Sequence, residues 1–232
     1  MTLRVIWILA LMALPPATLL PAQGETPRGV ALAAPGQRVS GTAWTTSAQT
    51  WLVLVRGAEG SRLESVTPRA IPVQDPCTGP DTTLALGRPI DGEALLLLAG
   101  EGLKPGRLNT AWRQPRFLYP GETVPLRLDE QWFSLTAYGQ AVPGAHDTFV
   151  EQYQLVLSHE STKDTIAAFQ RFGLEGHPEV RWAGDLDRDG RVDLLADLRT
   201  HYAGNRLVLF LSRGAGSGHL VRVAGRLDLP GC

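Results

Sequence analysis

Cysteine, methionine and lysine are scarce in this chain, which has two of each among its 232 residues. The formal net charge is −1, and the basic residues, nearly all of them arginine, are scattered singly along the sequence. Proteins that bind nucleic acid need a face on which basic residues cluster. The composition therefore predicts no nucleic-acid partner.

Long hydrophobic runs are also absent, except at the N-terminus. Arg4 precedes an apolar stretch from Val5 to Leu14, which Pro15 ends. This stretch is shorter than the roughly 20 residues that a membrane-spanning helix needs, and its layout is typical of a secretory signal peptide. We expect cleavage after Gly24, so that residues 1–24 form the signal peptide and the mature chain is periplasmic or secreted, with no membrane span. The alternative is an N-terminal helix that stays uncleaved.

The two cysteines, Cys77 and Cys232, would meet an oxidising compartment in an exported protein. One pair allows one connectivity, so we expect a disulfide between Cys77 and Cys232. In the chain-entropy model, a bond across so long a loop stabilises the fold by roughly 5 kcal/mol. The alternatives are two unpaired thiols, or a Cys232 that links the chain to a partner.

Most of the mature sequence consists of short apolar segments separated by Gly, Pro and Asp, a pattern typical of strands joined by turns. In Val124–Leu128 apolar and polar residues alternate, so one face of this segment should be buried. Leu95–Leu98 and Leu207–Leu211 are apolar throughout and should be covered on both sides. We predict a mainly β fold, in which antiparallel meanders form a sandwich or barrel-like domain. The predicted strands are Trp51–Val55, Ala94–Leu98, Val124–Leu128, Trp132–Tyr138, Tyr153–Leu157, Leu207–Leu211 and Leu220–Leu227.

Two segments are harder to assign. Thr165–Phe172 fits a strand or a short helix, and we favour the strand because it follows the first half of an apparent hairpin. The soft stretch Gly139–Thr148 separates an N-terminal β region, residues 25–138, from a C-terminal β region, residues 139–232. We expect these two regions to pack as one unit.

The most specific motif is an acidic loop at residues 185–193, with the sequence DLDRDGRVD. Side chains at its alternate positions converge, Gly190 permits a sharp turn, and a backbone carbonyl adds a further oxygen. Arg188 and Arg191 belong to the loop itself, and their side chains cannot reach into its centre. The carboxylates therefore repel one another unless a cation is bound. We therefore predict a calcium site. Its predicted ligands are Asp185, Asp187, Asp189, the carbonyl of Arg191 and Asp193.

Calcium is favoured over magnesium because the ligands are protein oxygens on a flexible loop. The competing interpretation is a solvated acidic turn that binds no ion. An EF-hand or dockerin loop needs an acidic residue at its twelfth position, which is Ala196 here. Leu194, Ala196 and Leu198 alternate with polar residues, so the segment after the loop is predicted to be a strand.

The segment Val180–Arg213 resembles the calcium loop of FG-GAP and VCBS-type repeats, best known from the propeller of integrin alpha subunits. In that family the loop connects two adjacent strands and its ion is a structural staple, so the resemblance implies a calcium-binding hairpin here. A full propeller is not expected, because the chain has a single copy of the motif. The chain as a whole also looks like small exported bacterial proteins that end in such a loop and a terminal cysteine.

Catalytic signatures are missing from the sequence. Ser158, His159 and Glu160 are adjacent, so their side chains point in different directions and cannot form a triad. The G-x-G-x-G run at 214–218 precedes a strand-like segment and is expected to be a hairpin tip rather than a phosphate cradle. The tryptophans are expected to be mainly core residues, Trp182 in particular, rather than a sugar-stacking platform.

The expected function is that of an exported, non-catalytic calcium-binding β protein. Calcium would be a structural staple for a surface that binds an unknown protein or glycan partner. The alternative is a periplasmic or secreted hydrolase or lyase that acts on polysaccharide or the cell envelope. An ion far from any cleft favours the first function, and an ion that lines a concave pocket favours the second.

Overall fold

The fold is built almost entirely from strands. The computed structural model describes residues 30–39, 51–75, 79–144, 148–201 and 204–231, and no α-helix occurs in these ranges. The prediction of a mainly β fold is confirmed. A 3₁₀ turn, Leu174–Gly176, follows β11. The strands are β1 (Val30–Ala33), β2 (Trp51–Gly57), β3 (Gly60–Val66), β4 (Arg69–Asp75), β5 (Gly79–Ala85), β6 (Glu93–Gly100), β7 (Gly106–Trp112), β8 (Thr123–Leu128), β9 (Gln131–Pro143), β10 (Thr148–His159), β11 (Thr162–Gly173), β12 (Glu179–Asp185), β13 (Asp193–Asp197), β14 (Gly204–Leu211) and β15 (Arg222–Pro230).

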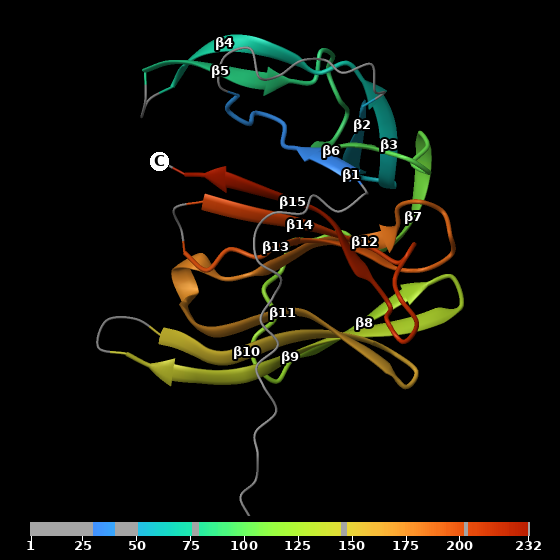
Figure 1. Cartoon of the computed structure of the whole chain (residues 1–232), viewed down its shortest axis with the longest axis vertical. Coiled ribbons are helices and arrows are strands. Elements are labelled where there is room, and N and C mark those ends of the chain that lie inside the picture. Colours follow the sequence, from blue (N-terminus) through green and yellow to red (C-terminus); the bar gives the residue numbers. More distant parts are fainter. Residues whose placement is uncertain (1–29, 40–50, 76–78, 145–147, 202–203, 232) are drawn as a thin grey trace, which may run out of the picture.

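Nine of these strands form one antiparallel sheet in the order β1-β6-β2-β3-β7-β12-β13-β14-β15. The sheet curls until β15 contacts β1, which makes it nearly closed and barrel-like (Figure 1). Strand β7 links the two halves of the sheet, because it pairs with β3 on one side and with β12 on the other. The connection from β12 to β13, which carries the acidic loop, is thereby held near the middle of the sheet.

The inside of the barrel-like sheet is filled mainly by leucine side chains and one tryptophan. Leu54, Leu96 and Leu209 are fully buried there. Trp182 of β12 is also fully buried, and its Nε1 donates a hydrogen bond to Oγ of Ser61 on β3 at 2.9 Å. Burying each large apolar side chain stabilises the fold by about 1.5–3 kcal/mol. Trp182 is a core residue, as predicted.

Two further layers cover the outside of the barrel-like sheet (Figure 1). A four-stranded antiparallel sheet, β11-β10-β9-β8, packs against β12, β13 and β14, and the hairpin β4–β5 lies over β2 and β6. The side chains of β14 alternate between layers: Leu207, Leu209 and Leu211 face the inside, whereas Val208 and Phe210 contact the four-stranded sheet. The prediction that this segment is covered on both sides is confirmed.

The predicted strands all occur, with boundaries shifted by a few residues. Thr165–Phe172 lies inside β11, which confirms the choice of a strand over a helix. Leu95–Leu98 is buried, as expected for a strand covered on both faces. The stretch predicted to separate the two β regions begins at Gly139, but Gly139 lies within β9, which forms a hairpin with β10. The predicted boundary after residue 138 therefore falls inside a strand.

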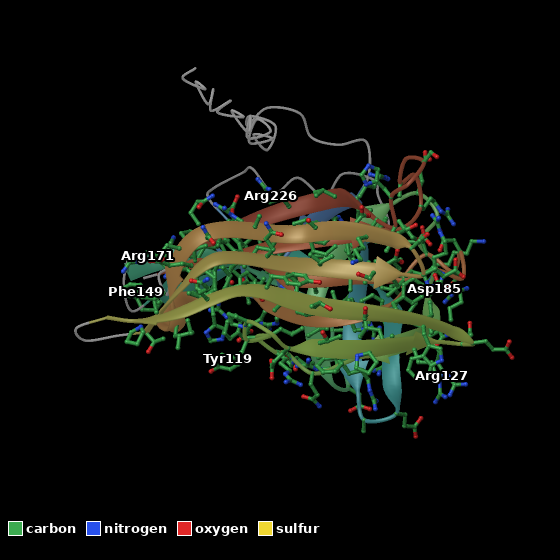
Figure 2. The ribbon with its side chains drawn as sticks, turned by 90° about the horizontal axis from the view of Figure 1, so that it is seen from below. Tyr119, Arg127, Phe149, Arg171, Asp185 and Arg226 are labelled. Atoms are coloured by element: carbon green, nitrogen blue, oxygen red, sulfur yellow. The ribbon has the colours of Figure 1, made fainter. Side chains whose placement is uncertain are left out.

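The acidic loop lies at one end of the four-stranded sheet. Figure 2 shows Asp185 at the end opposite Phe149 and Arg171, whose guanidinium group lies 4.1 Å above the Phe149 ring. At the loop end, Gln131 at the start of β9 donates through Nε2 to the carbonyl oxygen of Gly190 at 3.2 Å. This contact connects the loop to the turn between β8 and β9.

Several predictions fall outside the described residues. The signal peptide at residues 1–24, Cys77 and Cys232 all lie there, so the cleavage and the disulfide stay predictions. Among the residues that the structure does describe, no helix is long and apolar enough to cross a membrane.

Candidate metal site

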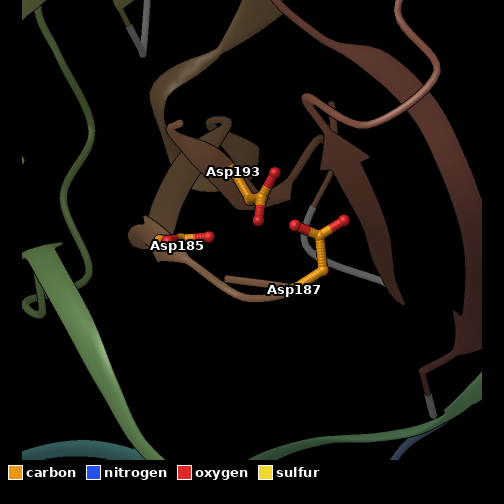
Figure 3. Close-up of side chains that lie close together, drawn as sticks. All are labelled: Asp185, Asp187 and Asp193. Atoms are coloured by element: carbon orange, nitrogen blue, oxygen red, sulfur yellow. The ribbon is translucent and has the colours of Figure 1, made fainter. Parts of the chain in front are cut away.

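The acidic loop is the tip of a β-hairpin, as the sequence predicts. Strand β12 ends at Asp185, β13 begins at Asp193, and Gly184 pairs with Asp193 across the hairpin. One carboxylate oxygen from each of Asp185, Asp187 and Asp193 lies within 4.8 Å of the others. Figure 3 shows these three side chains pointing toward one another. All three residues are buried, so the hairpin gathers three carboxylates in a space that water hardly reaches.

Asp185 folds the loop back on itself. Its Oδ1 accepts a hydrogen bond from the N–H of Asp189 at 3.0 Å, and its Oδ2 accepts one from the N–H of Gly190 at 2.9 Å. The turn also needs a left-handed backbone at Arg188 (φ 61°) and at Gly190 (φ 80°). Glycine adopts that conformation without steric cost, which explains its place in the motif.

Asp193 ties the loop to the neighbouring strand. Its Oδ2 accepts a hydrogen bond from the N–H of Leu186 at 2.7 Å. Its Oδ1 accepts two from Ser212, one from the N–H at 2.8 Å and one from the hydroxyl at 3.0 Å. Ser212 directly follows β14, is fully buried, and was not singled out by the sequence. Only the register of β13 on β14 brings it beside Asp193.

Asp187 is the least satisfied carboxylate of the three. The side chain is almost completely buried, and neither oxygen has a hydrogen-bond partner among the described residues. Among the described residues its close positively charged neighbour is Arg213, whose Nε lies 2.9 Å from Oδ2 in ion-pair contact without hydrogen-bond geometry. A buried polar atom without a partner costs about 1–3 kcal/mol, and more when it is charged. Asp187 is therefore the carboxylate of the loop that a bound cation would stabilise most.

One predicted ligand, Asp189, is not part of this cluster. The hydroxyl oxygen of Ser212 lies 3.0 Å from Oδ1 and 2.9 Å from Oδ2 of Asp189, so its single hydrogen is shared between Asp189 and Asp193. Arg191 forms an ion pair with Asp189, its Nε lying 3.5 Å from Oδ2. Asp189 is not one of the three clustered carboxylates, and the roles of Asp189 and of the Arg191 carbonyl as ligands stay predictions.

The arginines of the loop are directed away from the three carboxylates, as expected. Arg188 donates through Nη2 to the carbonyl oxygen of Pro105 at 2.9 Å, and Arg191 contacts Asp189 and the carbonyl oxygen of Ser212. The positive charge nearest to the cluster is instead that of Arg213, which is distant from the loop in sequence. Sequence reasoning missed it for the same reason that it missed Ser212.

Burial and mutual repulsion disfavour the ionised form of these carboxylates. Burial, together with the charge of Asp189, raises the pKa of Asp187, although Arg213 opposes the shift. Burial raises the pKa of Asp193 to about 7, with a further contribution from the charge of Asp187 and against the hydrogen bonds from Ser212 and Leu186. A bound cation would remove this penalty, because it stabilises the ionised form of every carboxylate around it. The three aspartates can thus hold a metal ion.

The other candidate residues do not form a site. His159 donates through Nδ1 to the carbonyl oxygen of Trp132 at 2.9 Å, and its ring stacks on Phe133. This position does not make a triad with Ser158 and Glu160. The glycine run at 214–218 lies between β14 and β15, as the hairpin-tip prediction requires.

A second buried aspartate, Asp164 of β11, was also missed by the sequence. Its Oδ2 accepts hydrogen bonds from the N–H of Leu220 at 2.6 Å and of Val221 at 3.0 Å, and its Oδ1 contacts Nδ1 of His219 at 2.8 Å. Asp164 therefore joins the four-stranded sheet to the segment that leads into β15. Both oxygens of Asp164 thus have partners within the protein, as is usual for a carboxylate that stabilises a fold.

A pocket of about 300 Å³ lies elsewhere, between the β13–β14 connection and the end of β15. Arg199, Asn205 and Leu229 are among the residues that line it, and none of the three clustered aspartates does. The candidate cation site is therefore separate from this pocket.

Comparison with known proteins gives no family or function for the chain. No family model, no curated protein and no solved structure matches it.

Proposed function

We propose that the loop Asp185–Asp193 binds one calcium ion, which acts as a structural staple in an exported, non-catalytic β protein. The observation that carries the proposal is the carboxylate of Asp187, which is buried at the centre of the loop and has no hydrogen-bond partner there. Asp185 and Asp193 place two more carboxylates beside it. A divalent cation would offset most of the negative charge of these three carboxylates at once.

Calcium suits this site better than magnesium. It takes 6–8 oxygen ligands in flexible geometry, whereas magnesium demands a near-ideal octahedron and keeps several waters. The clustered carboxylates supply part of this shell. Asp189, the carbonyl of Arg191 and water are proposed to complete it.

A structural role fits the position of the loop in the fold. It joins β12 to β13 at the middle of the nine-stranded sheet, and Ser212 links it to β14. Fixing the loop would therefore fix the ends of three neighbouring strands. The likeness to FG-GAP and VCBS-type loops, in which the ion staples a hairpin, agrees with this role.

Export agrees with a calcium-dependent fold. The N-terminal sequence has the layout of a signal peptide, and calcium outside the cytoplasm is abundant enough to fill sites of modest affinity. We place the mature chain in the periplasm or the medium, where the rest of its surface would bind a protein or glycan partner.

The alternative, a hydrolase or lyase acting on polysaccharide or the cell envelope, is less well supported. A catalytic ion should line a concave pocket that a substrate can enter. The three clustered carboxylates are buried and do not line the pocket at the β13–β14 connection. Both observations favour the structural role.

Thermal unfolding of the mature chain in calcium, in magnesium and in chelator tests the proposal. A hundredfold excess of calcium over Kd should add about 2.7 kcal/mol, which corresponds to a rise in Tm of about 5–10 °C for a chain of this size. Magnesium should give a smaller rise.

The variant Asp187→Asn should abolish the calcium response. The matched control is Asp228→Asn, which removes an exposed carboxylate that pairs with Arg206 far from the loop, and which should keep the full response. An equal calcium response in wild type and Asp187→Asn would place the ion elsewhere and overturn the proposal.

A further inference from the structure

One residue outside the acidic loop already sits at the proposed cation site. Arg213 follows Ser212, and the two hydrogen bonds from Ser212 to Asp193 fix the chain at this point beside the loop. Nε of Arg213 lies 2.9 Å from Oδ2 of Asp187, and Nη2 donates to the carbonyl oxygen of Asp187 at 3.4 Å. A single guanidinium group thus contacts both the side chain and the backbone of Asp187.

The opposite side of this guanidinium group is also in contact. Gly102, in the turn between β6 and β7, lies so close that a Cβ atom there would be 2.4 Å from Nη1 of Arg213. The backbone of Arg213 is held as well, because Nε of Arg222 donates to its carbonyl oxygen at 2.9 Å. These contacts hold Arg213 between Asp187 and a turn of the barrel-like sheet, although its side chain is half exposed.

A calcium ion and this guanidinium group compete for the same carboxylate. Calcium binds oxygen at about 2.3–2.6 Å, whereas Oδ2 of Asp187 already has Nε of Arg213 at ion-pair distance. Two positive groups on one buried carboxylate also repel each other strongly, because the low dielectric screens them poorly.

We propose that Arg213 is the internal counter-ion of the cation-free site, and that calcium displaces its guanidinium group from Asp187. Arg213 then sets the calcium affinity of the site, because part of the binding free energy is used to break the Arg213–Asp187 pair. Binding would also release the contact of Arg213 with the turn at Gly102. This inference rests on the proposed calcium site and names the residue that tunes it.

The test is a calcium titration of the full mature chain by isothermal calorimetry, comparing wild type with Arg213→Gln. Removing the competing charge should tighten calcium binding about tenfold, at the lower end of the coupling measured between close charges. In chelator, the same variant should unfold at a lower temperature than wild type, because Asp187 loses the positive charge that lies closest to it among the described residues.

The charge-matched control is Arg107→Gln. The carbonyl oxygen of Arg107 lies near the loop, 3.4 Å from Nη2 of Arg188, but its side chain is exposed and pairs with Glu59. The control should change calcium affinity less than about twofold, because exposed charges are screened. An effect as large as that of Arg213→Gln would assign the result to net charge and overturn the inference.

A second variant acts on Arg213 without changing it. Gly102 has a φ of 82°, so alanine is strained there whatever occupies position 213. Its methyl group, on the side of the guanidinium group opposite Asp187, would press that group toward Asp187 and should weaken calcium binding in wild type, but not in Arg213→Gln. Equal weakening in both backgrounds would show that the methyl group acts by another route, and would count against the inference.

The possible results separate the inference from the site itself. Calcium binding that is equal in wild type and Arg213→Gln, or weaker in Arg213→Gln, would overturn the role of Arg213 and leave the site standing. Absence of binding in both proteins would overturn the proposed calcium site. Binding by Arg213→Gln alone would support both.

Discussion

Two buried aspartates, Asp164 and Asp187, differ in how their carboxylates are satisfied. Asp164 accepts hydrogen bonds from the backbone of Leu220 and Val221 and contacts His219, whereas Asp187 accepts none among the described residues. Burial alone would raise both pKa values. The hydrogen bonds to Asp164 reverse the effect and lower its pKa, while the pKa of Asp187 stays raised despite Arg213.

This difference separates a carboxylate that holds the fold together from one that is arranged for a ligand. The protein supplies all the partners of Asp164, so nothing needs to bind there. At Asp187 the fold gathers like charges and leaves the Asp187 carboxylate without a hydrogen-bond donor among the described residues, which is costly unless an ion binds. Burial by itself does not identify a site; at Asp187 burial is combined with two oxygens that lack hydrogen-bond partners and with neighbouring carboxylates.

The largest expected loss of stability follows from substituting Asp164, the carboxylate that has hydrogen-bond partners within the protein. In chelator at neutral pH, Asp164→Asn should lower the free energy of unfolding by about 2 kcal/mol, because the amide keeps only one acceptor oxygen and loses the charge that strengthens the hydrogen bonds from Leu220 and Val221. Asp187→Asn, the same change at the other carboxylate, should leave stability unchanged or raise it slightly. Urea unfolding of both variants measures the contrast. Equal losses in the two variants would remove the distinction between the two carboxylates.

The pH dependence of stability should differ between the cation-free and calcium-bound protein. Burial raises the pKa of Asp193 from the ordinary 3.8 to about 7 in the folded chain, so between these pH values the folded state holds a proton that the unfolded state releases. The resulting stability is fully present below about pH 4 and is lost as the pH rises to about 7. Asp164, with its lowered pKa, contributes in the opposite sense and only in acid.

Calcium should cancel the Asp193 part of this dependence, because it binds the ionised carboxylate. Urea unfolding at pH 5 and pH 8, each in calcium and in chelator, provides the measurement. In chelator the chain should be less stable at pH 8 than at pH 5, and the stabilisation by calcium should be larger at pH 8. A calcium effect that is the same at both pH values would argue against the buried carboxylates as ligands.

The smallest expected effect concerns the turn of the acidic loop. Gly190 and Gly36 both have positive φ, 80° and 77°, and both face open space. Replacing either by alanine should cost about 1 kcal/mol of stability in chelator, because alanine is strained in this conformation. Calorimetry should show weaker calcium binding for Gly190→Ala only. Weaker binding in Gly36→Ala as well would mean that general loosening of the fold, and not the loop, controls affinity.

The fold class and the hairpin around the acidic loop follow from local patterns. Alternation in Val124–Leu128 and apolar runs such as Leu207–Leu211 correctly predict strands, and the alternation after Asp193 correctly predicts a strand rather than an EF-hand helix. Strand β7 escaped prediction, since its segment Gly106–Trp112 mixes polar and apolar residues without an apolar face.

The rest of the site depends on contacts that no local pattern records. Ser212 and Arg213 reach the loop only because β14 pairs with β13 in one particular register, in which Leu194 lies opposite Phe210. The hydrogen bonds to Asp164 likewise join β11 to a segment more than fifty residues away. Spacing along the chain identifies the aspartates, and tertiary pairing decides which of them lack partners.

The most direct test is a crystal structure of the mature chain grown with calcium, in which anomalous scattering locates the ion. The account predicts one calcium ion bonded to carboxylate oxygens of Asp185, Asp187 and Asp193 at about 2.3–2.6 Å. Three carboxylates with no ion between them in saturating calcium, or an ion bound only at another place on the chain, would contradict it.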